Sequence, residues 1–213
     1  MQFPPNNLGS KVVIQNIRSK RHYSETKKNI RIELIKKRKL FHSHSEESSN
    51  NIARNLIKFF NNNNYSVKNK STAIYWPIGS EVDTRPTIAA LHEYEARICL
   101  ASTEKNDIQY RLWAPNDKIK INKLGIIIST QKIKKPDIII CPLLGFDSKL
   151  NRLGRGGGYY DKSLFKFKNI IKIGLAYSVQ KINMVPIEKH DISMDAIITE
   201  KTIYDQNTII KEC

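Results

Sequence analysis

Hydrophobic residues recur at helical spacing in the first part of the chain. Ile30, Leu34 and Phe41 fall on one face of a helix predicted over residues 25–41, and a second apolar stripe predicts a helix over residues 46–62. Each helix is therefore expected to pack one side on a hydrophobic core.

Short runs of β-branched and aliphatic residues follow, bounded by proline, glycine and polar residues. Such runs are typical of buried strands, and helical stretches alternate with them. This alternation predicts an α/β fold with a mainly parallel central sheet and helices on both faces. The predicted strands are residues 71–76, 97–101, 108–113, 124–128, 137–144, 170–177 and 196–199, and further helices are predicted at residues 84–94 and 159–167.

Five of the nine glycines lie between residues 145 and 158, directly after the apolar run of residues 137–144. Glycine tolerates positive φ and lets a ligand approach the main chain, and exposed N–H groups in such a loop form a concavity for anions. Arg152 and Arg155 add fork-shaped donors that suit phosphate oxygens. Free N–H groups at the start of the following helix add to them. A strand, a basic glycine loop and a helix together predict a polyphosphate site.

The glycine spacing matches neither of two common phosphate-binding patterns. The loop has no Gly-Lys-Ser/Thr ending, and its four glycines from 154 to 158 do not fit G-x-G-x-x-G. From the glycines alone, a flexible arginine-glycine turn or an RGG-like contact with RNA is an equal alternative. Asp161, which follows two tyrosines, is placed to hold a metal ion beside a bound phosphate.

Four other side chains are candidates for ligand contact. Trp76 ends a predicted strand and Glu81 lies in the loop after it, where α/β sheets place their ligands. Trp76 can stack on a flat heterocycle or pack in the core, and Glu81 can accept hydrogen bonds from a ring or balance a helix terminus. Lys27 and Arg31 are one helical turn apart and project side by side, which by itself is typical of a solvated basic helix.

Composition narrows the class of protein. The formal net charge of +16 favours an anionic partner, but the lysines are spread over every segment, which is more typical of a solvated surface. No basic block alternates with aromatic residues as on a nucleic-acid surface, and no apolar run approaches the roughly 18–20 residues of a membrane span. Cys99, Cys141 and Cys213 are few and far apart, which fits a reducing compartment.

The chain is expected to hold one folded domain over residues 25–205, with a tail at 206–213. Residues 1–24 contain no acidic residue and are expected to form a flexible basic arm, with a transit peptide as the alternative. The corresponding location is the cytoplasm, or the mitochondrial matrix if the arm is a transit peptide. His42 and His44 have no neighbouring ligands at a metal spacing and are expected at the surface.

The string LGFDSKLNRLGRGGGYYD, residues 144–161, closely resembles the signature of the 5-formyltetrahydrofolate cyclo-ligase family, also called methenyltetrahydrofolate synthetases. The resemblance extends in order over about residues 26–200. It implies a single-domain, three-layer Rossmann-like fold. The implied reaction is ATP-dependent closure of 5-formyltetrahydrofolate to 5,10-methenyltetrahydrofolate, with release of ADP and phosphate. The implied partners are ATP, Mg²⁺ and the folate, with or without a polyglutamate tail. Neither nucleic acid nor a membrane is expected to bind, and the chain is expected to be a monomer.

The resemblance also implies roles for particular residues, with Arg155 and Asp161 as the catalytic pair. The implied ATP-binding residues are Lys27, Lys28, Asn29, Ile30, Arg31, Arg152, Leu153, Gly154, Arg155, Gly156, Gly157, Gly158, Tyr159 and Tyr160. The implied folate-binding residues are Trp76, Glu81, Arg155, Gly156, Gly157, Gly158 and Tyr159. The implied metal ligands are Asp161 and Asp195.

The chain departs from the family pattern at the edge of the expected site. Leu100-Ala101-Ser102 stand where the family often has Leu-Pro-Arg, and Leu150 stands where glycine is usual. Ser129 and Thr130 stand where Glu-Pro is common. Two alternatives therefore stay open: a folate- or nucleotide-binding relative with weakened catalysis and, less favoured, an RNA-binding protein that uses the Arg-Gly-Gly-Gly loop.

Overall fold

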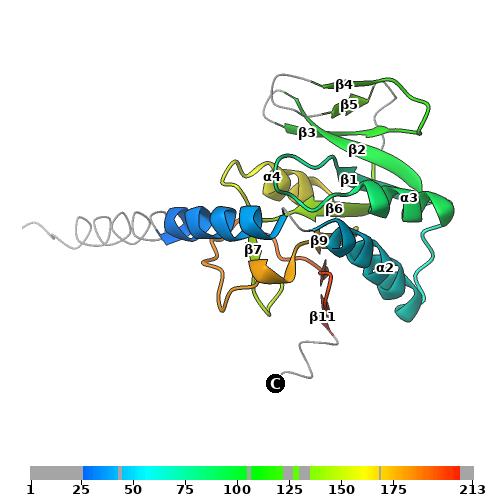
Figure 1. Ribbon diagram of the computed structural model, residues 1–213. Coiled ribbons are helices and arrows are strands. Elements are labelled where there is room, and N and C mark those ends of the chain that lie inside the picture. The colour runs from blue at the N-terminus through cyan, green and yellow to red at the C-terminus, as the bar shows by residue number, and fades with distance from the viewer. Residues whose placement is uncertain are drawn as a thin grey trace, which may run out of the picture.

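A seven-stranded sheet forms the centre of the structure. The computed structural model describes residues 26–42, 45–104, 107–121, 127–129, 135–167 and 169–206. The strands of the central sheet are β1 (Ser71–Tyr75), β2 (Arg97–Glu104), β3 (Asp107–Leu112), β6 (Ile138–Pro142), β9 (Ile171–Leu175), β10 (Ala196–Ile198) and β11 (Ile203–Asp205). Their order is β11-β10-β9-β6-β1-β2-β3, and only the edge strands β11 and β3 run antiparallel to their neighbours (Figure 1). The predicted α/β class with a mainly parallel sheet is confirmed.

Helices cover both faces of this sheet. The helices are α2 (Glu46–Asn62), α3 (Arg85–Glu93) and α4 (Tyr159–Lys166), and residues 26–42 form a further helix, here called the N-terminal helix. Successive side chains of a strand point to opposite faces. Ile138 and Ile140 accordingly join the core under α2 and α3, whereas Ile139 and Cys141 join the core that includes Leu164 of α4. Such strands are buried on both faces, which explains why their sequences are continuous apolar runs.

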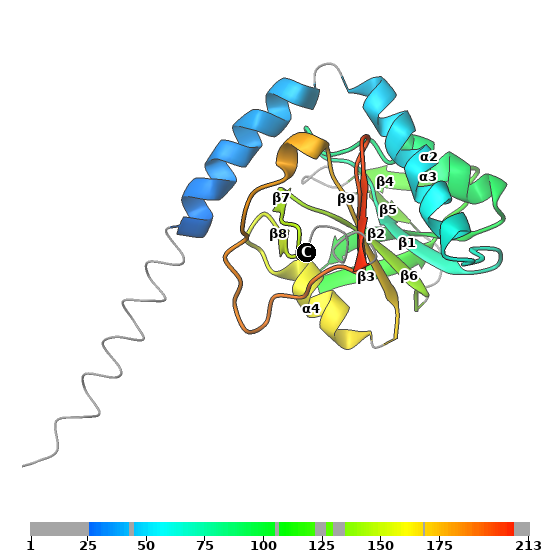
Figure 2. The same ribbon diagram turned by 90° about the horizontal axis from the view of Figure 1, so that it is seen from below.

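The N-terminal helix packs against a small hairpin rather than on the sheet (Figure 2). The hairpin consists of β7 (Gly145–Phe146) and β8 (Arg152–Leu153), and a second short pair consists of β4 (Ile119–Ile121) and β5 (Ile127–Ser129). Leu34 of the helix is buried against Leu153 and Val185. A Cβ at Gly145 would lie 2.5 Å from Leu34 Cδ1, so this close approach requires glycine. The hairpin begins the glycine loop, and this packing therefore brings the helix to the site.

The predicted elements are largely confirmed, with differences at their ends. The helix predicted over residues 46–62 has those bounds, whereas β2 runs three residues beyond its predicted end at residue 101. β4 and β11 were not predicted, and of the strand predicted at 124–128 only residues 127–128 are described, within β5. Cys99 and Cys141 are buried, as expected. Residues 1–24, Cys213 and most of the predicted tail lie outside the described residues, so the predicted domain boundaries stay predictions.

None of the helices in the described ranges combines the length and apolar character that crossing a membrane requires.

Candidate active site

A cavity of about 450 Å³ opens where the strand order reverses. β2 lies next to β1 on one side, and β6 lies next to β1 on the other side. The chain therefore continues from β1 to β2 in one direction across the sheet and from β6 to β9 in the opposite direction. In open α/β sheets, the crevice beyond the carboxyl ends of two such strands is the usual ligand site. Tyr75 and Trp76 at the end of β1, and Pro142 and Leu143 at the end of β6, line this cavity.

The glycine loop forms the side of the cavity next to α4. Gly154, Gly156, Gly157 and Gly158 all line it. Gly156 has φ +104° and Gly158, the N-cap of α4, has φ +65°, both in the region that favours glycine. A Cβ at Gly157 would lie 2.7 Å from Cε2 of Tyr159. Bare main chain and the start of α4 therefore face the cavity together, as an anion site requires.

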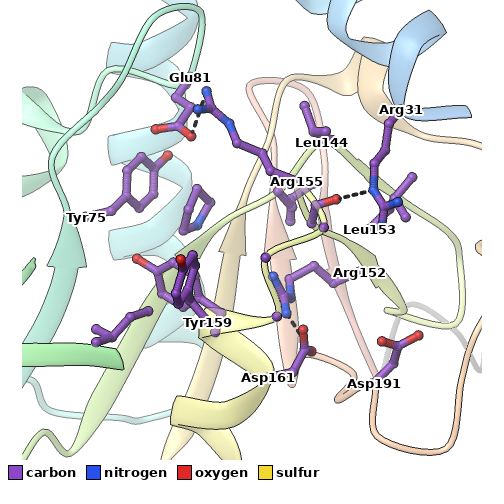
Figure 3. Close-up of a pocket in the computed structure, with 18 of the residues that line it drawn as sticks. Arg31, Tyr75, Glu81, Leu144, Arg152, Leu153, Arg155, Tyr159, Asp161 and Asp191 are labelled. Carbon is purple, nitrogen blue, oxygen red and sulfur yellow. Dashed lines mark hydrogen bonds and ion pairs between the residues drawn. The ribbon is translucent and has the colours of Figure 1, made fainter. Parts of the chain in front are cut away.

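Arg152 and Asp161 form an ion pair beside this loop (Figure 3). Arg152 Nη2 donates to Asp161 Oδ1 over 2.6 Å, and the Arg152 side chain is 3% exposed. Arg152 Nε has no hydrogen-bond partner within the described ranges. Such a buried donor at the cavity wall suits an incoming oxygen acceptor.

Two basic residues of the N-terminal helix face the same end of the cavity. Lys27 Nζ lies 2.6 Å from Asp191 Oδ2, and Arg31 Nε donates to the carbonyl of Gly154 over 2.9 Å. Lys27 also lies 3.5 Å from a Glu188 carboxylate oxygen. Both residues line the cavity, and their binding of a nucleotide, which the resemblance implied, stays a prediction. Lys28, Asn29 and Ile30, which the resemblance also placed in the nucleotide site, do not line it; the first two are exposed and Ile30 packs near Leu34.

Glu81 and Arg155 close the opposite end. Arg155 Nη2 lies 3.2 Å from Glu81 Oε1 and donates to the carbonyl of Ile78, and Glu81 Oε2 accepts the Ile78 N–H over 2.9 Å. Figure 3 shows the two side chains pointing toward each other. Burial raises the pKa of Glu81, against the opposing effects of Arg155 and the Ile78 amide. The carboxylate is therefore held in place and aimed at the cavity.

Aromatic and apolar side chains line the space near Glu81. Trp76 is half-buried and meets Trp113 edge to face, with ring centroids 6.5 Å apart. Tyr159 lines the cavity from the start of α4, and Ala101 and Ile108 line it from β2 and β3. A flat heterocycle with polar edges fits such an environment.

Two departures from the family pattern can now be placed. Ala101 lines the cavity, so the exchange at this position affects the site. Leu150 does not line it, but has φ +63°, a conformation that explains why glycine is usual there. The departure at Leu150 therefore strains the backbone without altering the cavity. The side chains of Ser129 and Thr130 are not among those that the structure describes.

The predicted pairing of Asp161 with Asp195 at one metal ion is not supported by this arrangement. Asp195 does not line the cavity; its Oδ2 accepts the Lys172 N–H over 2.7 Å and lies 2.8 Å from Lys172 Nζ. Asp191 is the second aspartate that lines the cavity with Asp161. In the described part of the chain, no three His, Cys, Asp or Glu side chains are grouped to hold a metal by themselves. Two carboxylates nevertheless suit Mg²⁺, which takes its other ligands from phosphate and water.

Sequence reasoning did not identify Arg38 or Asp191, although both line the cavity. Arg38 lies seven residues after Arg31 and four after Leu34, on the inward face of the helix, so helical periodicity could have found it. Asp191 lies in an irregular loop, where no spacing rule applies. Its place in the site follows from tertiary structure alone.

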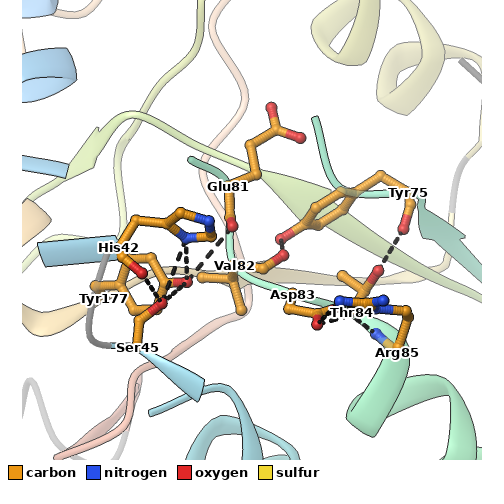
Figure 4. Close-up of polar contacts among 9 residues, drawn as sticks. All are labelled: His42, Ser45, Tyr75, Glu81, Val82, Asp83, Thr84, Arg85 and Tyr177. Carbon is orange, nitrogen blue, oxygen red and sulfur yellow. Dashed lines mark hydrogen bonds and ion pairs between the residues drawn. The ribbon is translucent and has the colours of Figure 1, made fainter. Parts of the chain in front are cut away.

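His42, which is expected at the surface, is half-buried at the end of the N-terminal helix. Its ring Nδ1 lies 3.2 Å from the hydroxyl of Tyr177, which also meets Ser45 Oγ at 3.0 Å and donates to the Glu81 carbonyl over 3.4 Å (Figure 4). These contacts join two helix ends to the segment that carries Glu81: His42 at the end of the N-terminal helix and Ser45 at the start of α2. His44 lies outside the described residues.

The sequence matches the 5-formyltetrahydrofolate cyclo-ligase family over residues 23–200. The 5-formyltetrahydrofolate cyclo-ligase of Haemophilus influenzae is 30% identical over 140 residues, which cover 61% of this chain and 75% of that protein. The Escherichia coli K12 enzyme of the same name is 25% identical over 146 residues, covering 63% and 80%.

Solved structures agree with this match. The 5,10-methenyltetrahydrofolate synthetase of Aquifex aeolicus superposes with a TM-score of 0.71 at 28% identity, over 84% of this chain and 92% of that one. The synthetase of Mycoplasma pneumoniae superposes with a TM-score of 0.64 over 82% and 98%, and at 24% identity it supports the fold alone. The match over most of the sequence, on this fold and around this cavity, shows that the chain belongs to the 5-formyltetrahydrofolate cyclo-ligase family.

Proposed function

We propose that the protein uses ATP and Mg²⁺ to convert 5-formyltetrahydrofolate to 5,10-methenyltetrahydrofolate, releasing ADP and phosphate. One observation carries this proposal above all: a single cavity joins a basic glycine loop at one end to a buried carboxylate and aromatic walls at the other. The first end suits a polyphosphate and the second suits a pterin. The reaction requires both ligands side by side.

The chemistry explains why phosphate-binding groups suffice. A formamide oxygen is a poor leaving group, so it first bonds to the γ-phosphorus while the bond to ADP breaks. N10 of the folate then bonds to the formyl carbon, the carbon–oxygen bond to phosphate breaks, and N10 loses its proton. Phosphoryl transfer depends on positioning and charge neutralisation rather than on a protein nucleophile. Burial raises the pKa of the Cys141 thiol to about 12, which leaves it protonated and unreactive.

In this proposal the cationic residues position and neutralise the phosphates. Lys27 and Arg31 reach the cavity from the N-terminal helix, and Arg152 and Arg155 reach it from the glycine loop. The main-chain N–H groups of residues 156–158 and the start of α4 complete the cradle. Lys27 and Arg152 are at present paired with Asp191 and Asp161, and we propose that these carboxylates turn to the metal when the nucleotide binds.

Asp161 and Asp191 are the residues that we propose to hold Mg²⁺. The ion when bound would offset the negative charge of the phosphates. Trp76 and Tyr159 would wall the folate, while Glu81 accepts hydrogen bonds from its ring. We further propose a monomer in the cytoplasm that binds the folate with or without its polyglutamate tail and binds neither nucleic acid nor a membrane.

The test is near-ultraviolet absorbance of the purified protein mixed with 5-formyltetrahydrofolate, Mg²⁺ and ATP. The product carries a conjugated amidinium and absorbs where the formyl compound does not. We expect a signal that requires both ATP and the folate. Folate binding without turnover by folded protein would instead indicate a relative with weakened catalysis, and salt-sensitive RNA binding without folate-dependent ATP hydrolysis would indicate an RNA-binding protein.

A further inference from the structure

Arg38 is a buried arginine that joins the two walls of the cavity. It belongs to the N-terminal helix and is 3% exposed. Its Nε donates to Ser80 Oγ over 3.2 Å and its Nη1 donates to the carbonyl of Leu143 over 3.2 Å. Ser80 precedes Glu81 in the segment after β1, and Leu143 follows β6. One guanidinium thus holds both sides of the crevice at the strand reversal.

Within the ranges that the structure describes, no carboxylate lies within ion-pair distance of the Arg38 guanidinium. A buried guanidinium keeps its proton, so its charge must be balanced by the surroundings. Burial lowers the pKa of Arg38, and the negative charge of Glu81 opposes this shift without cancelling it. Glu81 is also buried, and the positive charges of Arg155 and Arg38 both act to lower its pKa. The two buried groups therefore depend on each other electrostatically.

Arg155, the other cation near Glu81, has two possible tasks. Its side chain is 51% exposed and lies on the glycine loop, 3.2 Å from Glu81. The same guanidinium is proposed above to contact phosphate. An exposed side chain can make one of these contacts at a time. When Arg155 turns to phosphate, Glu81 keeps the Ile78 N–H and the field of Arg38.

We propose that Arg38 is the positioning residue for Glu81: it fixes the segment that carries this carboxylate and supplies the permanent counter-charge that remains when Arg155 moves to phosphate. The inference rests on the proposed function for its consequence in turnover, but its electrostatic part can be tested without any substrate.

The other titratable groups that face Glu81 do not supply this charge. Tyr75 approaches from β1 and Tyr160 from α4, and burial raises the pKa of both well above the ordinary value. Tyr177, at the end of β9, meets only the main-chain carbonyl of Glu81. Tyr75 and Tyr160 are therefore neutral near pH 7, so the positive charge that balances Glu81 comes from Arg38 and Arg155.

The first experiment is a ¹³C NMR titration of glutamate side-chain carboxyls, with Glu81→Gln used to assign the Glu81 signal. In Arg38→Gln the pKa of Glu81 should rise above its wild-type value, because a buried carboxylate loses a cation. Arg38→Lys keeps the charge, so its Glu81 pKa should lie closer to wild type. Arg85→Gln is the matched control: Arg85 pairs with Asp83 in the same segment but does not line the cavity, so the Glu81 signal should not move. If Arg38→Gln does not fold, Arg38→Lys and Ser80→Ala replace it.

The second experiment measures turnover in the folded variants. The KM for 5-formyltetrahydrofolate should rise about tenfold or more in Arg38→Gln, with a smaller change in kcat, and Arg38→Lys should recover part of this loss. A defect that is only structural would lower the amount of folded enzyme without moving the Glu81 titration. Adding Mg²⁺ and ADP to the wild type should shift the amide signals of the glycine loop.

An unchanged Glu81 titration in folded Arg38→Gln would overturn the inference, whatever the enzyme assay gives. An altered titration with no turnover in the wild type would leave the role of Arg38 toward Glu81 intact and contradict the proposed function instead.

Discussion

Arg152 Nη2 and Asp161 Oδ1 are 2.6 Å apart, and this pair fixes the start of α4 against β8. Because the Arg152 side chain is 3% exposed, removing the carboxylate leaves a buried charge without its partner. Asp161→Asn should therefore lower the free energy of unfolding by about 2 kcal/mol, in addition to lowering turnover strongly. Denaturant unfolding followed by fluorescence measures the first effect.

Asp107→Asn provides the control for that comparison. Asp107 pairs with Lys166 at the other end of α4, where both side chains are far more exposed. Exposed ion pairs contribute about 1 kcal/mol or less, so this variant should be nearly as stable as wild type. Equal losses in the two variants would show that burial of Arg152 does not determine the strength of its pair.

Arg155→Ala should separate activity from stability. The Arg155 side chain is 51% exposed, and its partner Glu81 is buried but keeps the Ile78 N–H, so its removal should lower the melting temperature less than Asp161→Asn does. Turnover should fall by about a hundredfold or more, because a donor to the transferred phosphate is lost. The absorbance assay and a thermal scan on the same sample check both statements. Normal turnover would refute the role proposed for Arg155.

Gly157→Ala should displace Tyr159 rather than unfold the loop. The new Cβ would lie 2.7 Å and 2.8 Å from two ring carbons of Tyr159, so the ring must move. We expect a several-fold rise in the KM for the folate. Gly79→Ala is the control, since Gly79 has φ +62° but a Cβ added there would have no atom within 4 Å. That variant should lose about 1 kcal/mol of stability through backbone strain and keep its affinity for the folate.

Asp191→Asn and Asp195→Asn distinguish the two possible partners of Asp161 at a metal ion. Asp191 lines the cavity, whereas Asp195 binds Lys172 outside it. The Mg²⁺ concentration for half-maximal activity should rise about tenfold in Asp191→Asn, as expected for the loss of a charged ligand. It should stay at the wild-type value in Asp195→Asn. The reverse result would restore Asp195 as the metal ligand implied by the resemblance.

The pH dependence of stability should report the burial of Glu81. Burial raises the pKa of Glu81, so between the ordinary value of about 4.3 and the raised one the folded state binds more protons than the unfolded state. The free energy of unfolding of wild type relative to Glu81→Gln should therefore fall as pH rises through this interval and level off above it. Urea unfolding at a series of pH values measures this difference.

Asp83→Asn should give the opposite slope. Burial acts to raise the pKa of Asp83, but hydrogen bonds from Arg85 outweigh it and the pKa is lowered. Its ionised form therefore stabilises the fold above the ordinary aspartate pKa, and that stability is lost as pH falls through the lowered value. A slope of the same sign in both variants would contradict the assignment for Glu81.

Local patterns in the sequence determined the elements and the glycine loop. Helical periodicity, apolar runs and the glycines of residues 154–158 depend on short-range geometry, which a sequence displays directly. The family signature then implied Lys27, Arg31, Glu81 and Arg155 as site residues, and the fold brings all four to one cavity.

Only the tertiary structure decided which of two nearby aspartates faces Asp161 and what balances the charge of Glu81. Asp191 and Asp195 are equally polar and lie in the same irregular segment, so sequence gives no reason to prefer one. Arg38 reaches Ser80, the residue before Glu81, because the N-terminal helix packs its Leu34 on Gly145, a contact between residues far apart in the chain. Long-range packing of this kind leaves no periodic pattern in the sequence. It nevertheless determines where the buried guanidinium of Arg38 lies.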